Sequence, residues 1–457
     1  MTGGVETTGL SADLRERILA VPEFDEFPSV DDLDRMAREL AEAHPDVVRR
    51  ERVGTSRLGE PIHALIVAGG DESAIVFGGV HPNEPIGGLT SLHLVRALCE
   101  DPQLRSDLGL TWHVIPCIDP DGTRLNEGWF AGPFTRSHYG RHFYRPPAEE
   151  QVEWTFPFSY KQAYFDRVLP ETLALMRLID ATKPAFMCSL HNGELGGVYY
   201  YLSRPMPGVY GPLQAIPEML GLPLDRGEPE VPFVQELGDA IYGMIRSEEA
   251  YDFNERMGLD PTRDGGSSSA AYAEKYGTLT LVSELPYWVD ERAQDQSPIS
   301  QSYAEVLREH AERFEELTDA IADTLTAVEA DLVTDSPYLR ATRQFLPGLQ
   351  QIPEGDRRRA EQEQSQRPAT VAERHSFDDN IHCFRMRYAG MLLRALDGEL
   401  AVGNQTAAIR GQAQALGSQY DEWCRAADDA TPSEHVPIGA LVANQFGAIV
   451  ATAVELA

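Results

Sequence analysis

The chain has 457 residues and ordinary apolar content, which suffices for one large domain with an addition or for two to three domains. Its formal net charge of −33 disfavours nucleic acids and anionic membranes as partners. No stretch approaches the ~18–20 apolar residues of a membrane span, and residues 1–24 lack the features of a secretory signal. The five cysteines are scattered without CxxC spacing, so we expect free thiols and a cytoplasmic location.

Helical and strand patterns alternate over the first 300 residues. Strands are predicted at 47–53, 62–67, 74–80, 112–118, 185–190, 198–202 and 279–282, and helices at 33–41, 86–98, 169–179, 234–251 and 270–276. This order predicts an α/β fold, a mixed twisted sheet with helices on both faces. No period persists over the arginine-rich residues 123–160, and a long irregular segment at a sheet edge is more often functional than idle.

The character of the sequence changes after about residue 300. Apolar residues recur at spacings of three and four over 306–332, which predicts a long amphipathic helix. Residues 348–372 are polar and predicted as an exposed loop, and helical segments follow near 378–398, 403–428 and 437–456. We divide the chain into a catalytic domain at 1–299 and a helical C-terminal appendage at 300–457, through which the protein could form a homo-oligomer.

Four side chains at strand ends could form a metal-dependent active site. His81 and Glu84 lie on the turn after the strand at 74–80, at the sheet edge where ligands bind in open α/β folds. Together they could hold zinc, which needs a third protein ligand in a catalytic site. His191 is the best candidate because it also ends a buried strand. Glu284 ends another apolar strand and could act as general base beside the metal.

Five segments, in the right order and at compatible spacing, resemble the zinc metallocarboxypeptidases, the funnelin-type enzymes that remove a C-terminal amino acid. The segments are 53–62, the HxxE motif at 81–84, Pro120-Asp121-Gly122, Ser189-Leu190-His191, and Gly265-Gly266-Ser267 with 281–285. The resemblance covers about residues 30–290. It implies the fold of that family and one Zn²⁺ per chain on His81, Glu84 and His191, with Glu284 as general base and acid.

The chain departs from the family at the substrate-binding residues. The Asn-Arg pair that clamps the terminal carboxylate in the family is absent before Phe156-Pro157. Arg145 matches the oxyanion-stabilising arginine best, although a structural ion pair is an equal alternative for it. Arg141 is the second candidate, and Arg124 is a further candidate for substrate binding.

The resemblance therefore implies a zinc-dependent hydrolase that releases a C-terminal amino acid from a peptide by attack of zinc-bound water. Because the clamp is missing, a second hypothesis is a zinc amidohydrolase or deacylase of the aspartoacylase-like branch, acting on a small acylated amino acid. A third is a binding or scaffold protein on a retired hydrolase fold, with the appendage as its interaction surface.

Overall fold

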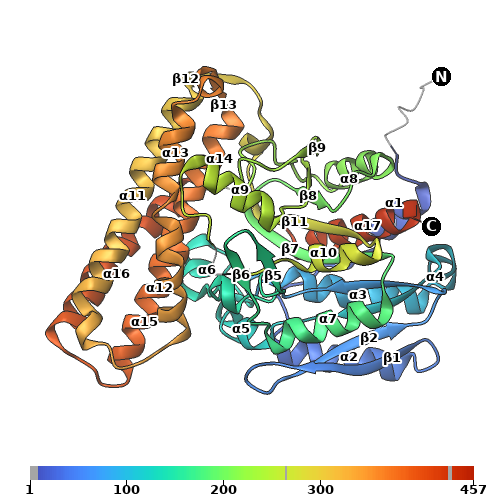
Figure 1. The fold of residues 1–457 in the computed structure, drawn as a ribbon. Coiled ribbons are helices and arrows are strands. Elements are labelled where there is room, and N and C mark those ends of the chain that lie inside the picture. Colours follow the sequence, from blue (N-terminus) through green and yellow to red (C-terminus); the bar gives the residue numbers. More distant parts are fainter. Residues whose placement is uncertain (1–8, 263–264, 431–434, 457) are drawn as a thin grey trace.

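A nine-stranded mixed sheet lies at the centre of the computed structural model, which describes residues 9–262, 265–430 and 435–456 (Figure 1). The strand order is β1-β2-β4-β3-β7-β11-β8-β10-β9. The strands are β1 (Val48–Thr55), β2 (Pro61–Val67), β3 (Glu72–Phe77), β4 (Leu110–Ile115), β7 (Phe186–Gly196), β8 (Tyr199–Leu202), β9 (Glu236–Gly238), β10 (Ile241–Gly243) and β11 (Leu279–Val289). Two small ribbons pair β5 (Phe158–Tyr160) with β6 (Ala163–Phe165), and β12 (Pro298–Ser302) with β13 (Pro368–Thr370).

Helices cover both faces of the sheet, so the predicted fold class is confirmed. The helices up to residue 300 are α1 (Ala12–Leu19), α2 (Val30–Ala43), α3 (Ile86–Glu100), α4 (Pro102–Leu108), α5 (Pro120–Arg124), α6 (Arg136–His142), α7 (Pro170–Thr182), α8 (Pro207–Met219), α9 (Ser247–Met257) and α10 (Ser269–Ala273). Ala74 and Val76 of β3 belong to the apolar core that contains α2 and α3. Ile75 and Phe77 belong to a second core that contains α7. Alternate side chains of a strand point to opposite faces, and here both faces are buried.

Strands β4, β3, β7 and β11 are parallel neighbours in the middle of the sheet. Their carboxyl ends therefore meet at one edge. The turn after β3 lies at this edge, and the far halves of β7 and β11 extend beyond it. This edge is where the sequence places the candidate active site.

The C-terminal helices form an arm beside the sheet, drawn in orange in Figure 1. They are α11 (Tyr303–Val328), α12 (Pro337–Leu349), α13 (Ile352–Ala360), α14 (Val371–Phe384), α15 (Gly390–Ala401) and α16 (Ala407–Ala430), with a π-helical segment, η7 (Arg385–Ala389), between α14 and α15. The apolar stripe of α11, which includes Phe314 and Ile321, is buried within the chain. It is therefore not available as the seam of a dimer.

The sequence predicted that the last helix belongs to the C-terminal appendage. In the structure this helix, α17 (Ile438–Leu456), lies outside the arm. It packs on the sheet domain against α1, α3 and α8, and Thr90 Oγ1 donates to Gln445 Oε1 at 2.7 Å. The helix is long and apolar enough to cross a membrane, which corrects the expectation that no stretch approaches a span. Because 83% of the apolar window is buried inside the protein, it is a core helix here.

Two further segments differ from the prediction. The predicted helix at 234–251 is instead β9, β10 and the start of α9, and α8 was not predicted. Residues 352–360, predicted as part of an exposed loop, form α13, which buries Pro353, Asp356 and Ala360. We did not predict α13 because its sequence is highly polar and shows no apolar period. Arg359 is only 15% exposed and pairs with Glu228.

Candidate active site

The turn after β3 is shaped by close packing on α3. A side chain at Gly78 would place its Cβ 2.6 Å from the carbonyl carbon of Gly87, so only glycine fits there. Gly79 has φ +66°, the left-handed region that favours glycine. These two residues turn the chain so that His81 and Glu84 face the sheet edge, where both are buried.

His191 meets this pair from the neighbouring strand β7. Its Nδ1 lies 3.2 Å from His81 Nδ1 and 3.2 Å from Glu84 Oε2. His81 Nδ1 is also 3.2 Å from both carboxylate oxygens of Glu84. Two ligand atoms in a tetrahedral zinc site, each about 2.0–2.1 Å from the metal, are about 3.3 Å apart. The spacing and the donor set of two histidines and one glutamate thus fit a catalytic zinc site, in which three protein ligands bind the metal.

Hydrogen bonds behind the cluster hold His191 in place. Its Nε2 lies 2.7 Å from Ser189 Oγ, which leaves Nδ1 facing the other ligands. Its backbone carbonyl accepts a hydrogen bond from Gln445 Nε2 of α17 at 3.0 Å. Such outer contacts orient the ligands of a metal site. The last helix therefore supports the site, although it lies more than 240 residues further along the chain.

Glu284 lies beside the cluster as the sequence predicted. On β11 it is the register partner of His191, and its Oε1 is 3.7 Å from His191 Nδ1. Its side chain lines the same cavity and is 8% exposed. Burial raises the pKa of this carboxyl group well above its usual range. A carboxylate that readily takes up a proton is suited to general base and acid catalysis.

Arg145 also reaches the cluster. Its Nη2 donates to Glu84 Oε1, and its Nε donates to Asn83 Oδ1 at 3.0 Å. The guanidinium group lines the cavity that the predicted ligands share. It can therefore donate to negative charge that develops next to the metal.

The other two predicted substrate-binding arginines do not reach this cavity. Arg141, on α6, points to α16 and pairs with Asp421 at 2.6 Å. Arg124, on α5, pairs with Glu60 at 3.0 Å and with Asp31 at 2.7 Å. Both side chains thus form ion pairs away from the cavity. The structure therefore places both outside the cavity that contains the predicted metal ligands, against the sequence prediction.

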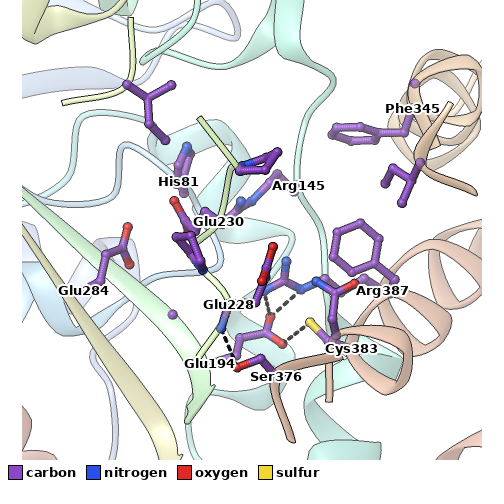
Figure 2. A pocket seen from close by; sticks show the side chains of 18 of the residues that line it. His81, Arg145, Glu194, Glu228, Glu230, Glu284, Phe345, Ser376, Cys383 and Arg387 are labelled. Atoms are coloured by element: carbon purple, nitrogen blue, oxygen red, sulfur yellow. Dashed lines mark hydrogen bonds and ion pairs between the residues drawn. The ribbon is translucent and has the colours of Figure 1, made fainter. Parts of the chain in front are cut away.

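The cavity around the cluster has a volume of about 1010 Å³ and lies between the sheet edge and the arm. Phe345 of α12, Cys383 of α14 and Arg387 of η7 lie across the cavity from His81 (Figure 2). The arm therefore builds part of the cavity that contains the candidate metal site. The sequence separates these residues from the ligands by more than 60 positions and contains no local pattern that brings them together.

A buried ion pair joins the arm to the ligand-bearing strand. Arg387 of η7 donates through Nε to Glu194 Oε1 at 2.6 Å, and Cys383 Sγ lies 2.9 Å from Glu194 Oε2 (Figure 2). Tyr139 also donates to Glu194 and accepts from Asn83 Nδ2. Glu194 adopts φ +62°, which costs energy for a residue other than glycine. These contacts keep the strained end of β7 in position three residues after His191.

We expect Arg387→Met to destabilise the protein strongly. The substitution leaves the Glu194 carboxylate, only 3% exposed, without its cation, and breaking a buried ion pair in this way costs about 3–5 kcal/mol. The free energy of unfolding in urea measures the effect. Arg357→Met is the matched control because it removes an exposed ion pair with Glu315, and it should cost less than about 1 kcal/mol. Equal effects of the two variants would contradict this account.

Comparison with known families matches residues 33–208 to the zinc carboxypeptidase family, which confirms the predicted resemblance for this part of the chain. Among solved structures, the chain resembles a metallo-carboxypeptidase from Burkholderia cenocepacia at 16% identity and TM-score 0.36, covering 57% of this chain and 60% of that one. It resembles carboxypeptidase A from Helicoverpa armigera at 15% identity and TM-score 0.38, covering 77% and 79%. It resembles thrombin activatable fibrinolysis inhibitor at 14% identity and TM-score 0.32, covering 45% and 61%. The chain thus spans about 60% of the length of the first and third of these structures.

Proposed function

We propose that this chain, whose residues 33–208 match the zinc carboxypeptidase family, is a zinc-dependent hydrolase that releases a C-terminal amino acid from a peptide. The observation that supports this most strongly is the convergence of His81, Glu84 and His191 within 4.8 Å of one another. The carboxylate of Glu284 lies beside them in the same cavity. This arrangement fits metal-assisted hydrolysis of an amide bond.

The three predicted ligands, Glu284 and Arg145 have different roles in this proposed reaction. His81, Glu84 and His191 would hold the zinc ion, which would supply a Lewis acid for the amide carbonyl and lower the pKa of the attacking water. Glu284 accepts a proton from this water and returns it to the nitrogen of the leaving amine. Arg145 donates to the carbonyl oxygen as it gains negative charge.

Arg145 is also the group that supports binding of a free C-terminus. The three arginines that line the cavity within the described part of the chain, Arg145, Arg359 and Arg387, all form ion pairs with carboxylates. Within the described residues, Nη1 of Arg145 makes no hydrogen bond, so this guanidinium retains a free donor near the ligands. We propose that this donor helps to position the end of the peptide.

Paired peptides test the proposal. Each pair has the same sequence and carries either a free or an amidated C-terminus, and mass spectrometry identifies the products. We expect loss of one C-terminal residue from the free peptide and little cleavage of the amidated one. Cleavage within the peptide, or hydrolysis of both forms at equal rates, would contradict release of a C-terminal amino acid.

We also propose a cytoplasmic location. The five cysteines are unpaired in the structure, and free thiols are usual in a reducing compartment. Fractionation of the source cells measures this directly. Recovery of the protein outside the cytoplasm would contradict the proposal.

A further inference from the structure

Three tyrosines extend the sheet face next to Glu284. Strand β8 runs antiparallel to β11, and Tyr199 is the register partner of Glu284 while Tyr201 is the partner of Val282. Tyr242 of β10 is the register partner of Tyr201. All three rings line the cavity, and their centroids are 5.8–6.4 Å apart. Opposed residues in neighbouring strands lie about 5 Å apart, so this group begins beside the catalytic carboxylate.

A carboxylate is held against these rings by their own hydroxyl groups. Tyr199 donates to Glu230 Oε1 at 2.9 Å, and Tyr201 donates to Glu230 Oε2 at 2.8 Å. Within the described part of the chain, no arginine, lysine or histidine forms an ion pair with Glu230. Its negative charge therefore remains available to the cavity, in which Figure 2 shows it with Glu228 and Glu284. We call Glu230 with Tyr199, Tyr201 and Tyr242 the tyrosine–glutamate subsite.

The cavity as a whole is negatively charged, like Glu230. Among the described residues that line it, ten are carboxylates and three are arginines, with no lysine. The arginines are neutralised by Glu84, Glu228 and Glu194. Four carboxylates have no cation partner within the described residues: Glu153, Asp225, Glu230 and Asp260. Glu284 has His191 at 3.7 Å.

Burying unpaired carboxylates away from water costs free energy. Asp225 receives only backbone N–H groups, from Gly197 at 3.3 Å and Gly227 at 3.0 Å, and burial raises its pKa to about 6. Carboxylates in a low-dielectric site are stabilised most effectively by a cation. The cavity-lining arginines already have partners, and the zinc ion of the proposed function would be held at His81, Glu84 and His191. A cation that reaches Glu230 would therefore come with the ligand.

We propose that the tyrosine–glutamate subsite binds a positively charged group of the substrate, an ammonium or a guanidinium. This inference rests on the proposed function and specifies its substrate class as peptides with a cationic residue beside the scissile bond. Glu230 supplies charge-assisted hydrogen bonds, and the tyrosine faces attract the cation. Because Tyr199 is the register partner of Glu284, the bound cation would lie next to the carboxylate that acts on the scissile amide.

Binding to the zinc-loaded Glu284→Gln enzyme tests the subsite without turnover. Calorimetry compares peptides that contain arginine with peptides that contain citrulline, its neutral isostere, at the last residue in one pair and at the residue before it in another. Peptides with a free or acetylated N-terminus form a third pair, which tests the α-ammonium as the source of the charge. We expect the cationic member of at least one pair to bind about 10- to 100-fold more tightly, as hydrogen bonds to charged groups do.

Additional substitutions identify the residues responsible. In the same background, Glu230→Gln should reduce the preference to less than about 3-fold, and Tyr242→Leu should reduce it in part. Glu422→Gln is the matched control, because Glu422 is exposed on α16 and does not line the cavity, and it should leave the preference unchanged. Equal binding of both members of every pair, or a preference that persists in Glu230→Gln, would overturn the proposal. Clear preference without turnover of any peptide by the unmodified enzyme would overturn the peptidase function and support the subsite.

Discussion

We expect Glu284→Gln to lower kcat by about 10²–10⁴-fold, the usual contribution of a general acid and base. The amide keeps the size and hydrogen-bonding capacity of the side chain but accepts no proton from water at neutral pH. Glu284 is not one of the three converging ligands, so the variant should still bind one zinc ion per chain. Initial rates on a peptide with a free C-terminus, with zinc content by mass spectrometry, measure both properties.

Glu422→Gln serves as the control for this variant, because it makes the same substitution at an exposed position on α16, outside the cavity. It should retain full activity. Full activity in Glu284→Gln would remove Glu284 from the mechanism. Loss of zinc from Glu284→Gln would instead assign it to the metal ligands.

The second large effect is expected from His191→Ala, which removes one of the two histidines proposed to bind zinc. A catalytic zinc site needs three protein ligands, so we expect zinc affinity to fall by more than about 100-fold and activity to fall with it. Competition with a zinc-binding dye measures the affinity. Circular dichroism checks that the variant remains folded.

Ser189→Ala should have a smaller effect on zinc affinity than His191→Ala. Ser189 contacts Nε2 of His191 and does not reach the cluster, so its loss should reduce zinc affinity by about 10- to 100-fold. We expect added zinc to restore its activity. If His191→Ala retained stoichiometric zinc at the affinity of the unmodified chain, the proposed ligand set would be wrong.

The central sheet was predictable because its strands have strong local patterns. Ile75, Val76 and Phe77 are apolar and buried on both faces, as a central parallel strand requires. The structure of α8 and α13 was less accessible from the sequence, because α8 contains Pro212 and Pro217 and α13 is highly polar. The packing of α17 depends on contacts with α1, α3 and α8 that no local pattern reveals.

The same distinction applies to the site. His81, Glu84, His191 and Glu284 follow apolar strands, so the topology of parallel strands predicts that they meet. Arg145 was selected through a family resemblance, and the structure brings it to Glu84. Arg141 and Arg124 were weaker candidates of the same residue type, and their side chains pair with Asp421 and Glu60 away from the cavity.

Other residues of the cavity could not be found by motif. Glu194 and Arg387 are 193 positions apart, and their pairing depends on how the arm docks. Glu230 lies in an irregular acidic segment in which many carboxylates look alike. Its contacts with Tyr199 and Tyr201 distinguish it, and they appear only in the folded chain.

The most direct test of the account is a zinc titration of one enzyme preparation. The protein is stripped with a chelator, zinc is added back in steps, and hydrolysis of a peptide with a free C-terminus is measured at each step. We predict no activity in the stripped protein and a linear rise that stops at one zinc ion per chain. Undiminished peptide hydrolysis by the stripped protein would contradict a zinc centre at His81, Glu84 and His191.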